Sequence, residues 1–323
     1  MFTVVLGLAG ALVYGAADFF GGLAARRISA LRVTALGALS GVVLLFLGTL
    51  LIPGQWSTSA LLWGAMSGVT GAAAIALLYA CLAIGPMSIL SPLTAVTSAI
   101  VPLTWGLVTG SELGAIAYPA FALALVAVVL VGFVPAKESV RPTTTGLLMA
   151  TTSGMLIGAF YILIDQTPDD SGLVPLVANR IVNASIMITL IVVVAVISGV
   201  RRVRVVDAPL AVLDGAHGAH GAHCVHGAPQ RAGLLRASAA ALRGGWRGGL
   251  LLAIGCGVLD ALANVIVLVG LRMGDLTIVS VLTALYPAGT IVLAALVLRE
   301  RIARLQWVGL ALALTASAML AAA

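Results

Sequence analysis

The internal repeat GPMSILSPLTA at residues 85–95 and GDLTIVSVLTA at residues 274–284 decides the fold. Six of the eleven positions are identical, and the same offset of 189 residues pairs Gly68 with Gly257. Both copies lie within apolar sequence. A fixed offset of this kind indicates a duplicated chain, and the apolar surroundings place the duplication in a membrane.

The composition agrees with a membrane setting. The 323 residues are 61% hydrophobic and 9% charged, whereas a soluble domain carries about 25% charged residues. The mean hydropathy is +1.17. The 37 glycines and the 5% of aromatic residues favour helices packed through small side chains over an aromatic-girdled β-barrel. We therefore predict an all-α polytopic membrane protein.

Charges, prolines and glycine clusters divide the chain into ten apolar stretches, each close to the ~20 residues that a helix needs to cross a bilayer. The N-terminal stretch lacks the positive region of a cleaved signal peptide, so we interpret it as a retained span. Gly85-Pro86 and Gly274-Asp275 predict tight hairpins. The ten predicted spans are residues 3–24, 32–52, 60–84, 87–109, 114–134, 145–165, 173–199, 248–271, 276–298 and 304–322.

Five spans separate the two repeat copies, and this odd number requires the second copy to be inverted in the membrane. We expect two inverted five-helix repeats, residues 1–138 and 139–323, the second interrupted by a low-complexity loop at about 200–247. A weaker match aligns Tyr14-Gly15 with Ile157-Gly158. Inverted repeats with a site near the midplane are typical of secondary transporters.

The basic residues predict the orientation. Loops after the odd-numbered spans hold 15 of the 17 Lys and Arg residues, and such loops usually face the cytoplasm. This places both termini outside the cytoplasm of a multi-pass protein of the cell membrane. The net charge of +6 therefore reflects membrane topology, and we expect no nucleic-acid partner.

The last span opens with Glu300-x5-Gln306-x2-Gly309. Together with the five-plus-five arrangement, this motif resembles the EamA family of the drug/metabolite transporter superfamily, over nearly the whole chain outside 200–247. In the first copy, Tyr118 and Phe121 stand where the glutamine and glycine would be. The resemblance implies a cavity lined mainly by spans 1, 3, 4, 6, 8 and 9. Family members are often drawn with cytoplasmic termini, which the charge distribution here contradicts.

Three charged residues lie in the interior of predicted spans, away from the span ends, where each costs about 2.5–3.5 kcal/mol or more unless it faces a cavity or a partner. They are Asp18, Arg180 and Asp260. One acid can form a buried ion pair with Arg180, which leaves one carboxylate over. Burial disfavours the charged form of such a carboxylate, so it could exchange a proton, or it could hold a substrate ammonium. We choose Asp260 as the unpaired acid because it lies nearest mid-bilayer.

Further candidates follow from the spans that the resemblance assigns to the cavity. Tyrosine rings can accept a cation, and hydroxyls can orient polar groups. For a single hydroxyl, an interhelical hydrogen bond is the competing interpretation, and this applies equally to Ser91 and Ser280. The candidate substrate- and proton-binding residues are Tyr14, Asp18, Tyr79, Thr94, Tyr161, Arg180, Asp260, Asn264, Thr283 and Tyr286.

All four histidines lie in the 200–247 loop, at His217, His220, His223 and His226. Imidazole is a zinc or nickel ligand, but the intervening glycines and alanines preorganise nothing, so the expected state is a linker without a metal. The three cysteines form no disulfide framework. We expect no cofactor.

These features predict a monomeric secondary active transporter of a small polar metabolite, working by alternating access among membrane lipids. We expect an exporter, with proton coupling as an option. No H-E-x-x-H or G-x-S-x-G motif is present, so an enzyme is not expected. The alternatives are a flippase for a lipid-linked headgroup and, from another class, a membrane scaffold or metal-sensing protein that uses the histidine loop.

Overall fold

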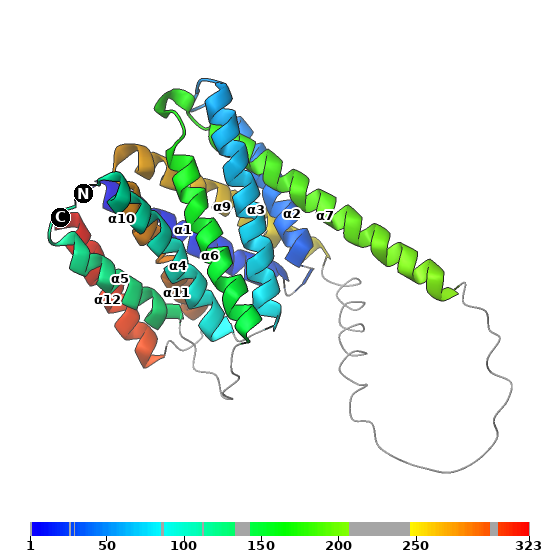
Figure 1. Ribbon diagram of the computed structural model, residues 1–323. Coiled ribbons are helices and arrows are strands. Elements are labelled where there is room, and N and C mark those ends of the chain that lie inside the picture. Colours follow the sequence, from blue (N-terminus) through cyan, green and yellow to red (C-terminus); the bar gives the residue numbers. More distant parts are fainter. Residues whose placement is uncertain are drawn as a thin grey trace, which may run out of the picture.

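The computed structural model describes residues 2–25, 27–28, 30–84, 87–111, 113–132, 143–206, 246–297 and 303–322. All regular structure in these residues is helical (Figure 1). The helices are α1 (Phe2–Ala25), α2 (Ala30–Gly48), α3 (Thr58–Ile84), α4 (Met87–Thr109), α5 (Ala117–Gly132), α6 (Thr144–Asp165), η1 (Asp169–Ser171), α7 (Val174–Val206), α9 (Trp246–Met273), α10 (Leu276–Thr283), α11 (Tyr286–Val297) and α12 (Arg304–Ala322).

Every predicted span overlaps a helix or a helix pair. Among the described residues, eight segments are long and apolar enough to cross a membrane, whereas α2 and α5 provide shorter apolar helices. The chain is therefore a polytopic membrane protein. The turn predicted at Gly274-Asp275 joins α9 to α10, and the Asp275 carboxylate accepts a hydrogen bond from the Thr277 backbone N–H at 2.7 Å. The other predicted turn, at residues 85–86, lies outside the described residues.

Two predicted boundaries are corrected. The stretch 276–298 is not one continuous helix, because the chain turns between Thr283 and Tyr286. Pro287 explains this break, since it has no backbone N–H to donate to the Thr283 carbonyl. In addition, α7 continues to Val206, so the basic residues from Arg201 to Arg204 belong to a helix and not to the start of a loop.

The main helix contacts join helices of the first half of the chain to helices of the second half. Helix α1 contacts α9, α10 and α11, and correspondingly α6 contacts α3 and α4. Likewise α2 packs on α9 as α7 packs on α3, and α5 packs on α12. If the chain is numbered as two sets of five spans, each of these contacts has its counterpart in the other set. Figure 1 shows both termini at one end of the bundle.

Glycines let several of these helix pairs approach closely. A Cβ at Gly68 on α3 would lie 2.6 Å from the Asn179 carbonyl oxygen of α7. A Cβ at Gly257, the repeat counterpart of Gly68, would lie 2.2 Å from the Gly37 carbonyl oxygen of α2. Both distances are shorter than a van der Waals contact, so each glycine lies where the backbones of two helices are in contact.

Candidate functional site

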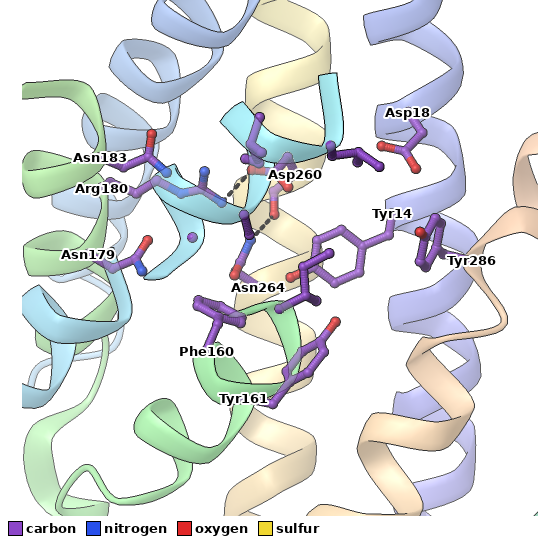
Figure 2. A pocket seen from close by; sticks show the side chains of 15 residues that line it. Tyr14, Asp18, Phe160, Tyr161, Asn179, Arg180, Asn183, Asp260, Asn264 and Tyr286 are labelled. Carbon is purple, nitrogen blue, oxygen red and sulfur yellow. Dashed lines mark hydrogen bonds and ion pairs between the residues drawn. The ribbon is translucent and has the colours of Figure 1, made fainter. Parts of the chain in front are cut away.

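A cavity of about 170 Å³ lies between α1, α3, α6, α7, α9 and α11 (Figure 2). Seven of its lining residues were candidates from the sequence, and they come from five different helices. These seven are Tyr14, Asp18, Tyr161, Arg180, Asp260, Asn264 and Tyr286. The cavity thus brings together all three charged residues that the sequence places in the interior of predicted spans.

Arg180 on α7 forms an ion pair with Asp260 on α9 (Figure 2). The Arg180 side chain is 9% exposed and that of Asp260 is 30% exposed. A Cβ at Gly41 on α2 would lie 3.4 Å from Arg180 Cδ, so this glycine gives the arginine stem room. The prediction that Asp260 is the unpaired acid is therefore wrong, because the geometry of α7 and α9 brings it to the arginine.

The carboxylate left over is Asp18 on α1. It makes no hydrogen bond or ion pair with the residues that the structure describes. Figure 2 shows it near Tyr286 and apart from the Arg180–Asp260 pair. Its side chain is exposed and lines the cavity. A small ligand entering the cavity would therefore reach an unpaired carboxylate.

Two asparagines on α7 flank Arg180 and also line the cavity. Asn179 donates to Ser67 Oγ of α3 at 2.8 Å. Asn183 is 4% exposed, and its Oδ1 has no hydrogen-bond partner within the described residues. A buried acceptor without a partner costs free energy, so Asn183 is suited to receive a donor from a ligand or a water molecule.

The tyrosines form the opposite wall. Tyr161 is 5% exposed, and its ring meets that of Phe160 edge to face with centroids 5.2 Å apart. Tyr14 and Tyr286 are half-buried and contribute from α1 and α11. On α9, Asn264 Nδ2 donates to the Asp260 backbone carbonyl at 2.7 Å. One end of the cavity is thus ionic and amide-lined, and the other is aromatic with a single carboxylate.

Two predicted site residues do not line this cavity. The Thr94 hydroxyl is fully buried and donates to the Leu90 carbonyl and, across to α6, to the Ala150 carbonyl at 3.1 Å. The Thr283 hydroxyl donates to the Val279 carbonyl of its own helix at 2.7 Å. Hydroxyls inside helices commonly bond back in this way, and Ser280 does the same with Thr277.

Other candidates cannot be placed. The structure does not describe the side chains of Tyr79 and Ser91. The four histidines and the motif residue Glu300 lie outside the described residues. Within the described part of the chain, no group of three or more His, Cys, Asp or Glu residues could hold a metal ion.

The sequence reasoning left eight lining residues off the site, and three of them carry information about it. Asn179 and Asn183 share a helix face with Arg180, and asparagines in an apolar stretch were a usable signal. Gly71 also lines the cavity, and it is the repeat counterpart of Asp260 at the offset of 189 residues. A small residue there leaves space opposite the ion pair.

The motif at the start of the last span has a packing role. Gln306 is buried, accepts a hydrogen bond from the Ala303 backbone N–H at 3.0 Å and donates to the Val131 carbonyl of α5 at 3.4 Å. A Cβ at Gly309 would lie 2.7 Å from the Val131 backbone nitrogen. Gln306 and Gly309 therefore stabilise the packing of α12 on α5, away from the cavity.

Comparison with known proteins gives a family match for the C-terminal part of the chain. Residues 232–322 match the EamA-like transporter family. The match extends over α9 to α12, the helices that carry Asp260, Asn264 and Tyr286, and it confirms the resemblance to the drug/metabolite transporter superfamily. A comparison with curated proteins found no match.

A solved structure resembles the fold of nearly the whole chain. It is a crystal structure described only as that of a protein, and it matches with a TM-score of 0.65 at 13% sequence identity. The alignment covers 98% of this chain and 95% of the other. At this identity the likeness concerns the fold alone.

Proposed function

We propose that this EamA-like protein is a secondary active transporter that carries a small polar metabolite across the cell membrane by alternating access. The observation that carries the proposal is the cavity in which Asp18 is accessible and unpaired while Arg180 and Asp260 neutralise each other. A carboxylate of this kind is costly inside a membrane. It is best explained as a group that binds a proton or a substrate cation during each cycle.

The contacts between helices of the two halves support the alternating-access part of the proposal. Two inverted five-helix repeats would rock against each other around the cavity, as in other carriers built from repeats. The packing of α1 on α9 mirrors that of α6 on α3. The glycines Gly68 and Gly257 hold equivalent contacts between helices, which supports a common origin of the two halves.

Packing on the termini side of the cavity is dense. Buried Leu268 and Leu271 on α9 and Leu276 on α10 belong to one apolar cluster that also includes the cavity residue Tyr161. Beyond them, Arg272 Nη2 donates to Ser171 Oγ at 2.9 Å. We infer that this end is closed in the present conformation, and that alternating access requires these contacts to separate.

Coupling would follow from a single shared group. A proton and a substrate that compete for Asp18 cannot both be bound, so an inward proton gradient would drive the substrate outward. Arg180 and the free Oδ1 of Asn183 would orient the polar part of the substrate. We therefore propose that the protein is a proton-coupled exporter.

The test begins with a thermal-stabilisation screen of purified protein against cationic, zwitterionic and anionic metabolites. The best stabiliser is then used as the transport probe in proteoliposomes. Asp18→Asn should abolish uptake driven by a pH gradient and, because the substrate shares this carboxylate, should also weaken binding of a cationic probe. The matched control is Asp169→Asn, because Asp169 is an exposed acid on η1.

Several outcomes contradict the proposal. Wild-type transport and an unchanged pH profile in Asp18→Asn would remove Asp18 from the mechanism. Movement of a lipid-linked headgroup alone would support the flippase instead. Loss of activity after residues 212–230 are replaced by a Gly/Ser linker, with normal expression, would support a role for the histidine loop, which lies outside the described residues.

A further inference from the structure

A second cavity, of about 400 Å³, lies between α2 and α7 near the N-terminal end of α2. Its walls are apolar except for Arg32. On α2, the residues Arg32, Leu36 and Leu39 follow helical spacing and line one face; on α7, Ile191 and Val192 line the other. We refer to this cavity as the α2–α7 groove. It shares no lining residue with the polar cavity.

The described helices leave parts of the groove uncovered. Leu39 is 44% exposed and Val192 is 54% exposed, although both line the groove. Ala35 is buried, lines the groove and packs against buried Met187. In a polytopic membrane protein such a surface faces lipid. The groove is therefore closed toward the protein interior and open toward the lipid.

Charge distinguishes the two ends of the groove. Arg32 lies near the start of α2 and is exposed, and the exposed Arg27 precedes it in the same connection. From Arg32 to Leu39 the helix rises about 10 Å at 1.5 Å per residue. An exposed guanidinium at one end and an apolar channel from there inward match the two parts of a phospholipid. Basic pockets between membrane helices recognise anionic headgroups in this way.

We propose that the α2–α7 groove binds an anionic phospholipid, with the headgroup phosphate on Arg32 and one acyl chain between α2 and α7. The lipid would hold these two helices at a fixed separation. The same helices shape the polar cavity, because α7 carries Arg180 and Gly41 of α2 packs against its stem. Bound lipid would therefore stabilise the ion-pair end of the site. This inference does not depend on what the polar cavity transports.

The test compares phosphatidylglycerol with phosphatidylcholine of identical acyl chains, added to delipidated full-length protein. Native mass spectrometry should detect one tightly held phosphatidylglycerol, with a preference over phosphatidylcholine of about five-fold, the contribution expected from one arginine near an anionic headgroup. Arg32→Gln should reduce the preference to about one. Arg304→Gln is the matched control, because Arg304 is exposed at the start of α12 and does not line the groove.

A second variant tests the apolar part separately. Val192→Trp places a large side chain in the groove from an exposed position, so it should remove the tightly held lipid of either headgroup without lowering the melting temperature in detergent. Equal headgroup preference in wild type and Arg32→Gln would overturn the proposal. Retention of the lipid in a folded Val192→Trp protein would also overturn it, as would a dimer that Val192→Trp dissociates, since a second copy would then fill the groove.

Discussion

Arg180 on α7 and Asp260 on α9 form an ion pair inside the cavity, and this pairing leaves Asp18 as a carboxylate without a partner within the described residues. The two acids therefore have different roles despite their shared cavity. Asp260 is required for stability, because its loss would leave the buried Arg180 without a charged partner. Asp18 is the group that is available to ligands, and the two acids should respond oppositely to substitution.

Breaking the ion pair should be strongly destabilising. Arg180→Leu or Asp260→Leu alone leaves one charge buried without its partner, which typically costs about 3–5 kcal/mol. The double substitution removes both charges and should recover most of that loss. Thermal unfolding in detergent across the four proteins gives the coupling free energy directly. Losses that simply add in the double variant would mean that the two charges do not interact.

Asp18→Asn should stabilise the empty protein. An amide carries no charge, so it avoids the cost of holding an unpaired carboxylate inside the membrane, and we expect a melting temperature above that of wild type. The gain should grow as pH rises, because only then is the wild-type carboxylate charged, and it should vanish at low pH, where the carboxylate is protonated. Melting temperatures measured across pH will test this. A variant that is less stable than wild type at high pH would show that Asp18 has a stabilising partner.

The repeat-related glycines should be equally intolerant of a methyl group. Gly68→Ala and Gly257→Ala each force a Cβ into a neighbouring helix backbone, and overpacking of this kind costs about 1–3 kcal/mol. Gly22 and Gly255 serve as controls, because a Cβ at either meets nothing within 4 Å. Their alanine variants should unfold at or above the wild-type temperature, since alanine favours a helix. Equal effects at all four positions would contradict the packing argument.

Orientation remains a prediction from the sequence. Because 15 of the 17 basic residues lie in loops or at helix ends between an odd-numbered predicted span and the next span, a C-terminal reporter should be read as extracytoplasmic. Paired fusions to a periplasm-active and a cytoplasm-active enzyme would decide the matter. A cytoplasmic C-terminus would return the protein to the orientation in which the family is usually drawn.

The positions of the helices could be predicted from the sequence, because a membrane-spanning helix requires a long apolar run and such runs are visible in the sequence itself. It did not locate the break before Tyr286, although Pro287 carried the signal. The sequence could not decide that Arg180 pairs with Asp260, because this contact depends on how α7 and α9 are rotated about their axes. Thr94 and Thr283 were misplaced for a local reason, as their hydroxyls bond to carbonyls one turn earlier.

The mutual neutralisation of Arg180 and Asp260 also has an electrical consequence. With that pair intact, the net charge of the empty cavity is the charge of Asp18 alone: minus one when it is ionised and zero when it carries a proton. Moving one elementary charge through the membrane field changes the free energy by about 2.3 kcal/mol per 100 mV. Return of the empty carrier should therefore respond to voltage when Asp18 is ionised and ignore it when Asp18 is protonated, so the current per cycle reports which form crosses.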